Sequence, residues 1–144
     1  MKKYIFIVSL LCLLAACTGK RQGEAAAKVA ALPAVEDVVM YQVNPRVFAP
    51  EKSFKAVERR LDSIQALGIN VVWFMPINEV GQEKSVNSPY CVKDYKGVNP
   101  EFGTLDEFKA LVATCHQKGI NVIIDWVANH TSWDNAWIVN KEWY

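Results

Sequence analysis

The sequence has no excess of either charge and very little histidine. Its 144 residues include 16 Lys and Arg against 15 Asp and Glu, and only two histidines. Proteins that bind nucleic acid through a basic face carry a clear positive excess, so this balance argues against nucleic acid as a partner. Two histidines also disfavour a histidine-based metal centre. Because 51% of the residues are hydrophobic, the composition is that of a globular protein.

No apolar run is long enough to span a membrane. The run at residues 4–16 is interrupted only by Ser9, whereas a spanning helix needs about 20 apolar residues. Two lysines precede the run and Leu14-Ala-Ala-Cys17 ends it, which is the layout of a secretory signal. That ending resembles the lipobox of bacterial lipoproteins. It predicts a signal peptide at residues 1–16, lipid on Cys17, and export to the periplasm, the outer membrane or the cell surface. The alternative is a plain secretory signal in which Cys17 is incidental.

Cysteine is scarce as well. Of the four cysteines, Cys12 lies in the predicted signal and Cys17 is assigned to lipid, which leaves Cys91 and Cys115. Cys115 falls late in a predicted helix and Cys91 in the loop before it, roughly 16 Å apart along the helix axis. A disulfide requires Cα atoms about 4.4 to 6.8 Å apart. We therefore predict two free thiols.

The hydrophobic pattern divides the chain into three parts. Residues 1–16 form the predicted signal, residues 17–35 an Ala-rich, polar tether, and residues 36–144 the folded part. In the folded part, short apolar runs alternate with amphipathic segments. The pattern predicts strands at 38–43, 71–75 and 122–124, and helices at 53–67 and 104–118. Ser53 is the predicted N-cap of the first helix, and Thr104-Leu-Asp-Glu107 forms a capping box at the second.

The order of these elements predicts a parallel α/β fold. Both helices lead into strands through the same short turn, Gly68-Ile-Asn70 and Gly119-Ile-Asn121. A doubly wound sheet or a (β/α) barrel begins in this way. Long loops after the strands favour the barrel, and no glycine-rich phosphate loop follows the first strand.

A complete barrel takes about 250 residues. We therefore predict the N-terminal fragment of a TIM (β/α)₈ barrel, with three strands and two helices, ending in the loop after the third strand. Both faces of strands 71–75 and 122–124 read as apolar, and we expect them to be partly uncovered in such a fragment.

Polar and aromatic side chains gather where the predicted strands end. Asp125-Trp-Val-Ala-Asn129-His130 follows the third strand and could bind sugar hydroxyls, a metal or a reacting group. The alternative is an Asp that caps backbone amides and a solvated His. Tyr90 lies in the long loop, and a Tyr ring suits stacking on a pyranose. The aromatic residues of 126–144 could line a sugar groove or pack an added loop domain.

Five segments together resemble the opening of the α-amylase family of glycoside hydrolases, family 13. They come in the family's order and spacing and span nearly all of residues 38–144. The segments are Tyr41-Gln-Val-Asn-Pro-Arg-Val-Phe48, Trp73-Phe-Met-Pro76, Ser88-Pro-Tyr-Cys-Val-Lys-Asp-Tyr95, Asn99-Pro-Glu-Phe-Gly-Thr104 and Asp125-Trp-Val-Ala-Asn-His130. The last is the family's first signature region and is specific by itself.

The resemblance implies a role for each matching residue. Tyr90 matches the tyrosine that stacks on the glucose beside the scissile bond, and His130 matches the histidine that hydrogen-bonds the same sugar. Asp125 matches an aspartate that supports the active-site hydrogen bonds. Asn129 matches an asparagine that ligates calcium in calcium-dependent members, with oxygen donors that suit this ion.

The implied function is that of an α-glucan (starch or maltooligosaccharide) hydrolase. The family takes its catalytic Asp, Glu and Asp from strands four, five and seven, so we expect no catalytic carboxylate in this chain and no hydrolysis by it alone. The alternative is a non-catalytic glucan-binding lipoprotein. In either case the expected partners are an α-glucan and the membrane, through lipid on Cys17.

Overall fold

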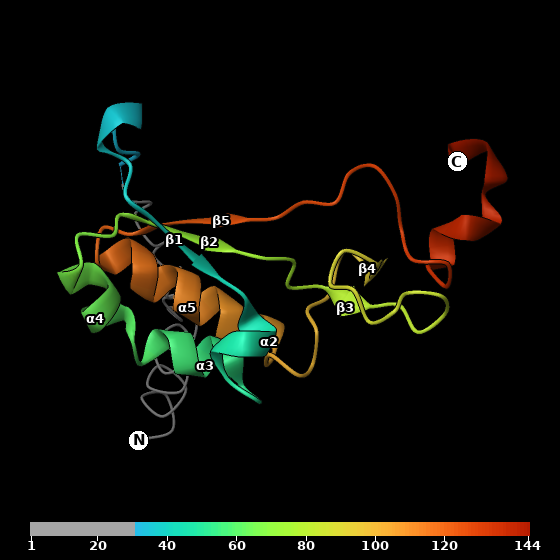
Figure 1. Ribbon diagram of the computed structural model, residues 1–144, viewed down its shortest axis with the longest axis horizontal. Coiled ribbons are helices and arrows are strands. Elements are labelled where there is room, and N and C mark those ends of the chain that lie inside the picture. Colours follow the sequence, from blue (N-terminus) through green and yellow to red (C-terminus); the bar gives the residue numbers. More distant parts are fainter. Residues whose placement is uncertain (1–30) are drawn as a thin grey trace, which may run out of the picture.

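The computed structural model describes residues 31–144 (Figure 1). The predicted signal peptide, the lipid-carrying Cys17 and most of the predicted tether lie outside the described residues. Among residues 31–144, no helix has the length and apolar character needed to cross a membrane.

The main sheet has three parallel strands in the order β1-β2-β5. Strand β1 covers Met40–Val43, β2 covers Val71–Phe74 and β5 covers Asn121–Ile124. The register aligns Val43 with Phe74 and Phe74 with Ile124. Helices α3 (Ser53–Glu58), α4 (Leu61–Ala66) and α5 (Leu105–Gln117) all lie on one face of the sheet (Figure 1). This arrangement confirms the predicted parallel α/β fold.

Helix α5 begins and ends as its sequence predicts. Thr104 Oγ1 accepts a hydrogen bond from the Glu107 amide (3.1 Å), and Glu107 Oε2 accepts one from the Thr104 amide (2.8 Å). This capping box satisfies two amides that a helix start would otherwise leave unpaired. Gly119 follows the helix with φ of 74°, a left-handed conformation that glycine adopts without strain.

The first predicted helix is divided into α3 and α4. Arg60 donates its amide to Val57, three residues back, and this tighter turn interrupts the regular helix. The prediction of Ser53 as N-cap is wrong, because Ser53 is the first helical residue and Lys52, with φ of 49°, precedes it. The Ser53 hydroxyl instead donates to the Pro45 carbonyl (2.6 Å) in α2 (Pro45–Phe48), which ties α3 to the loop after β1.

Three phenylalanines form the centre of the core between the helices and the sheet. The Phe54 and Phe108 ring centroids are 5.0 Å apart, and those of Phe74 and Phe108 are 5.6 Å apart. Leu61 and Leu111 are fully buried beside them. The apolar stripes read from the sequence therefore do face the sheet.

The opposite face of the sheet carries no helix in the described part of the chain. Ile123 and Ile124 in β5 are 43% and 42% exposed, so the prediction of an uncovered strand is right for β5. It is wrong for most of β2, where Val71, Val72 and Phe74 are at most 6% exposed. The middle strand has a neighbour on each side, whereas β5 forms an edge of the sheet.

A second, smaller sheet lies within what the sequence suggested was one long loop. Strands β3 (Glu79–Val80) and β4 (Val92–Asp94) pair in antiparallel fashion. Three short 3-10 helices complete the described chain: η2 (Val35–Asp37), η3 (Ala136–Val139) and η4 (Lys141–Trp143). The two last helices and the small sheet lie beyond the C-terminal ends of the parallel strands (Figure 1).

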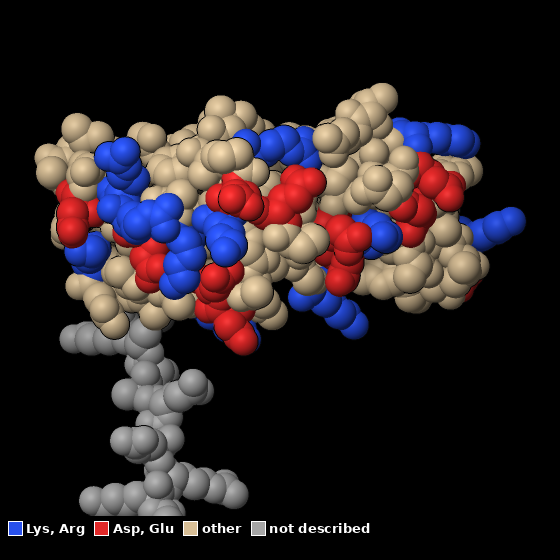
Figure 2. Space-filling view, turned by 90° about the horizontal axis from the view of Figure 1, so that it is seen from below, with Lys and Arg blue, Asp and Glu red and all other residues tan. Residues whose placement is uncertain are grey.

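The helix-covered face carries both charges in close alternation. Figure 2 shows Lys and Arg side chains interspersed with Asp and Glu across this face. Two of the contacts are ion pairs, from Lys55 to Glu58 and from Lys118 to Asp62. The face therefore presents no patch of a single sign.

Candidate functional site

Asp125 connects three segments at the C-terminal edge of the sheet. Its amide donates to the Phe74 carbonyl (2.9 Å), which continues the pairing of β2 and β5 by one residue. Its carboxylate accepts one hydrogen bond from Trp73 Nε1 (2.7 Å) and another from the Tyr90 hydroxyl (2.8 Å). The two donors come from β2 and from the loop between β3 and β4, so the carboxylate fixes that loop above the strand ends.

The Tyr90 ring is partly exposed to solvent, while its hydroxyl is hydrogen-bonded. The side chain is 39% exposed. The hydrogen bond to Asp125, and then partial burial, raise the pKa of the Tyr90 phenol above its ordinary value. The phenol is therefore neutral at physiological pH and acts as a donor to the carboxylate. The exposed part of the ring is free to contact a flat apolar surface such as a sugar face.

The loop that carries Tyr90 contains three residues in left-handed conformations. Lys84, Val86 and Asn87 have φ of 52°, 47° and 57°, which is uncommon for residues other than glycine. The Arg46 guanidinium donates to the Asn87 carbonyl (2.8 Å) and to Asn87 Oδ1 (3.3 Å). Arg46 thus anchors the strained loop to α2, a role that the sequence did not assign to it.

Asn129 and His130 follow β5, four and five residues after Asp125 in the chain. The His130 imidazole Nδ1 is 3.3 Å from Asn129 Nδ2, and both side chains are exposed. In the described part of the chain, no hydrogen bond joins the His130 side chain to Tyr90 or Asp125. The structure therefore joins two of the three predicted sugar-binding residues, Tyr90 and Asp125, by a direct hydrogen bond.

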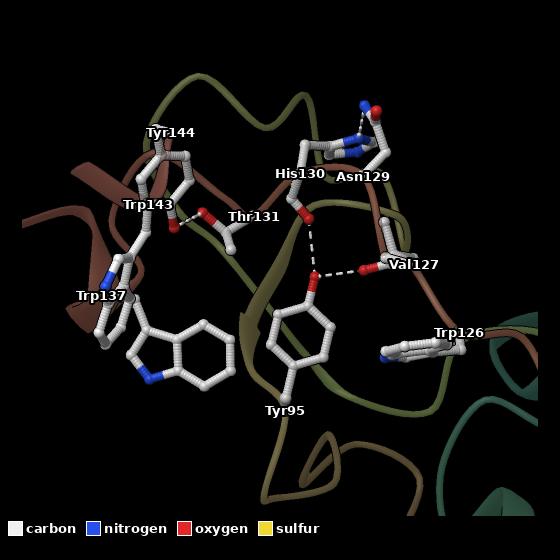
Figure 3. Close-up of a pocket in the computed structure, with 10 residues that line it drawn as sticks. Tyr95, Trp126, Val127, Asn129, His130, Thr131, Trp137, Trp143 and Tyr144 are labelled. Carbon is white, nitrogen blue, oxygen red and sulfur yellow. Dashed lines mark hydrogen bonds between the residues drawn. The ribbon is translucent and has the colours of Figure 1, made fainter. Parts of the chain in front are cut away.

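Tyr95 contributes to holding the chain after β5. Its hydroxyl lies 2.7 Å from the Val127 carbonyl and 2.7 Å from the His130 carbonyl, and shares its proton between them (Figure 3). Its ring stacks on Trp137, with centroids 5.3 Å apart and planes 9° apart. The sequence placed Tyr95 with Tyr90 in one loop segment whose Tyr rings could stack on a sugar, and did not predict these contacts to the chain after β5.

A cavity of about 610 Å³ opens beside this residue. Four other aromatic side chains and the segment after β5 surround it (Figure 3). The lining consists of Tyr95, Trp126, Val127, Ala128, Asn129, His130, Thr131, Trp137, Trp143 and Tyr144. Trp137 packs on Tyr95 and Trp143 and also borders the cavity. That these aromatic residues line a sugar groove stays a prediction. Trp133 does not line the cavity, and contacts Lys84 Nζ at 4.1 Å from the ring centroid.

Asn129 is the residue that the family resemblance assigns to calcium. Asn129 offers one amide oxygen, and no group of three or more His, Cys, Asp or Glu gathers anywhere in residues 31–144. Calcium prefers six to eight oxygen ligands. The assignment of Asn129 to calcium stays a prediction.

The predicted free thiols are confirmed for both cysteines in the described range. Cys91 is half-buried and Cys115 fully buried, and neither forms a disulfide. Burial raises the pKa of the Cys115 thiol to about 11. Cys115 is therefore a packing residue of α5 and not a nucleophile.

Comparison with known proteins gives matches over most of the described chain. The sequence profile described as "Alpha amylase, catalytic domain" matches residues 52–142. A probable oligo-1,6-glucosidase 2 of Bacillus subtilis is 33% identical over 112 residues, which is 74% of this chain and 19% of that protein. The human amino acid transporter heavy chain SLC3A1 is 38% identical over 103 residues, or 68% of this chain and 15% of that protein.

Solved structures match as well. The crystal structure of an alpha-amylase from Lactobacillus plantarum superposes with a TM-score of 0.69 at 39% sequence identity, covering 75% of this chain and 26% of that one. The chain thus spans about a fifth of the length of the curated relatives it matches and a quarter of this solved structure.

Proposed function

Since this chain belongs to the α-amylase family of glycoside hydrolases, we propose that it supplies part of the sugar-binding site of an enzyme that cleaves α-glucosidic bonds in starch or maltooligosaccharides. The observation that carries the proposal is the shared Asp125 carboxylate, which holds Tyr90 over the ends of the parallel strands. In (β/α) barrels, substrates bind at this edge of the sheet.

The chemistry of the three residues suits a glucose unit. The partly exposed Tyr90 ring offers an apolar face, and pyranoses present flat C–H surfaces to such rings. The Asp125 carboxylate has lone pairs beyond those used by Trp73 and Tyr90, and these can accept hydroxyl protons. His130 offers an exposed imidazole that can donate or accept.

We assign no catalytic carboxylate in this chain. Glycosidic cleavage needs a pair of carboxyl groups on either side of the scissile bond, about 5 Å apart in enzymes that retain configuration. Asp125 already accepts hydrogen bonds from two side chains. Asp94 accepts the Lys96 amide (2.9 Å) within a turn. Both carboxylates therefore have structural roles. The family resemblance places the reacting pair of carboxyl groups on later strands.

The second candidate function is glucan binding without catalysis. It is favoured by the match to the human protein, which is named as an amino acid transporter heavy chain and not as a glycosidase. A chain that resembles this family can therefore belong to a protein whose name denotes another function. Under this alternative Tyr90, His130 and the aromatic residues of the cavity serve to capture the sugar.

The test is a titration of the purified chain with maltohexaose, followed by NMR, with cellohexaose as the β-linked control. We expect resonances of Tyr90, Asp125 and His130 to shift with maltohexaose only, and Tyr90→Ala to abolish the shifts. Leu67→Ala, at an exposed apolar residue that follows α4 and lies outside the cavity, serves as the control and should leave them unchanged. Equal responses to both sugars, or none, would contradict an α-glucan site.

A reducing-sugar assay on the same samples tests the catalytic assignment. We expect no release of reducing ends from maltohexaose by this chain alone. Release that survives purification and disappears in Asp125→Asn would show that the catalytic groups lie here after all. Binding of maltohexaose by a longer protein without any hydrolysis would favour the non-catalytic alternative.

We further propose that the chain is exported as a lipoprotein and held at a membrane through Cys17. The support is the sequence alone, in which a basic start, a short apolar run and Leu14-Ala-Ala-Cys17 follow one another. Metabolic labelling with radioactive palmitate should mark the wild-type protein and not Cys17→Ser. Labelling of both would refute the assignment, and export without labelling would support a plain secretory signal.

A further inference from the structure

Two segments far apart in the sequence are joined over the ends of the strands. We call residues 79–95, which contain β3, β4 and Tyr90, the hairpin, and residues 127–135, which contain His130, the strap. The Ser132 amide donates to the Val92 carbonyl (2.9 Å), and Asn135 Nδ2 donates to the same oxygen (3.3 Å). Ser132 and Asn135 are 2% and 3% exposed, so this contact is buried.

Asp134 adds a charged hydrogen bond to these contacts, beside the Lys84 ammonium over the Trp133 ring. Its Oδ2 accepts the Gln82 amide at 2.9 Å. This hydrogen bond is the main reason that the pKa of the Asp134 carboxyl is lowered, with smaller contributions that include the charge of Lys93. Hydrogen bonds from a backbone amide to a carboxylate are stronger than those between neutral groups.

The hairpin and the strap approach each other closely at Gly81. A methyl group on Gly81 would collide with Ser132 Cβ and Asp134 Oδ1. Ser132 Cβ is attached directly to the backbone, so the collision could be relieved only by moving the strap. Glycine is therefore required for the two segments to approach this closely.

The hydrogen bonds from Tyr95 hold the N-terminal part of the strap, at Val127 and His130. The Tyr95 hydroxyl bonds the carbonyl of His130 itself, and burial raises the pKa of this phenol, which keeps it a donor. The strap is thus held at two points: at the His130 carbonyl by Tyr95, and four residues later at Asp134 by Gln82. Within residues 31–144 the His130 imidazole is hydrogen-bonded to its neighbour Asn129 and not to Tyr90 or Asp125. Its position relative to the hairpin therefore depends on the contacts that hold the strap.

We propose that Asp134 is a positioning residue, whose carboxylate fixes the strap on the hairpin and so sets where His130 lies relative to Tyr90. The proposal rests on the proposed function, because it concerns the placement of two residues expected to contact one sugar. Asp134 does not touch that sugar, since its carboxylate is engaged with Gln82 and packed against Gly81.

The test compares Asp134→Ala and Asp134→Asn in the full chain. Loss of a hydrogen bond to a charged group should speed amide exchange at Gln82 and Ser132 by about tenfold in Asp134→Ala, and by less in Asp134→Asn, which keeps an acceptor oxygen. The His130 imidazole resonances should shift, and the dissociation constant for maltohexaose should rise by a similar factor. Glu51→Ala, at an exposed carboxylate without a hydrogen bond or ion pair in the described residues, should change nothing.

Gly81→Ala breaks the same contact from the hairpin side and should reproduce these effects with Asp134 intact. Exchange at Leu111 in α5 separates positioning from a general loss of stability, because a positioning residue leaves it unchanged. An equal acceleration of amide exchange at Leu111 would overturn the proposal. So would faster exchange at Gln82 and Ser132 without any change in the affinity for maltohexaose. If the wild-type chain does not bind maltohexaose, the proposed function fails, whereas unchanged exchange at Gln82 and Ser132 in both variants refutes the role of Asp134 itself.

Discussion

The hydrogen bond between Tyr90 and Asp125 allows a direct test of how the candidate site is held. Tyr90→Phe removes a single oxygen atom, the hydroxyl that donates to Asp125 Oδ2 at 2.8 Å, and keeps the ring. The Asp125 carboxylate would retain only its hydrogen bond from Trp73. The change therefore isolates one contact between the loop of Tyr90 and the end of β5.

The expected cost follows from the exposure of the pair. A hydrogen bond to a charged group contributes about 1.5 to 3 kcal/mol when water cannot replace the lost donor. Because Tyr90 is 39% exposed, water can reach the carboxylate and recover part of this energy. We expect the free energy of unfolding to fall by about 1 kcal/mol, which corresponds to about 4 °C in Tm for a domain of this size.

The assay is urea denaturation followed by circular dichroism between pH 7 and pH 11. Folding raises the pKa of Tyr90 above its ordinary value of 10.0, so folding favours the neutral phenol. The contribution is complete below pH 10 and is lost as the pH rises through the higher pKa of the folded state. The difference between the wild type and Tyr90→Phe should therefore shrink at the alkaline end.

The matched control is Tyr41→Phe. The Tyr41 ring packs against the core, and its hydroxyl makes no hydrogen bond within residues 31–144. The substitution removes the same atom without breaking a contact. A Tyr90→Phe protein that is no less stable than Tyr41→Phe, or a difference that stays constant through the titration of Tyr90, would refute the reasoning.

Three further predictions concern the scaffold of the site. Thr104→Ala should lower the free energy of unfolding by about 1 kcal/mol, because it removes the side-chain half of the capping box of α5; urea denaturation measures this, and Thr104→Ser should restore it. Leu111→Ala should lower the free energy of unfolding by about 2 to 5 kcal/mol, since Leu111 is 0% exposed and its truncation leaves a cavity in the core; a loss below about 1 kcal/mol would mean that the core repacks around the smaller side chain. Iodoacetamide at pH 8 should modify Cys91 well before Cys115, whose pKa is raised to about 11; equal rates by mass spectrometry would contradict the burial of α5.

The regular elements were predictable because their signals are local. The Thr104-Leu-Asp-Glu107 box and the stripe of apolar residues after it lie within a few turns of one helix, and α5 forms as expected. The repeated Gly-Ile-Asn turn predicted two parallel connections, and the sheet has them. Ser53 shows the limit of this reasoning, because its hydroxyl bonds the Pro45 carbonyl and not its own helix.

The small sheet was not predictable because its strands are too short to show a pattern. Strands β3 and β4 have two and three residues and are separated by a loop. They depend on contacts from residues about 40 positions away, such as the Ser132 amide on the Val92 carbonyl. No local periodicity encodes such a contact.

The sequence by itself determined the alternation of strand and helix, the family resemblance and the residue types of the candidate site. Propensity, capping and apolar spacing are properties of neighbouring residues, and Tyr90, Asp125 and His130 could be named from motifs alone. Only the tertiary structure decided which of them meet: Tyr90 and Asp125 bond directly, while His130 is held through Tyr95. The physical reason is that directed hydrogen bonds between distant segments depend on how the loops fold back over the strand ends, and the chain acquires that geometry only when the core is packed.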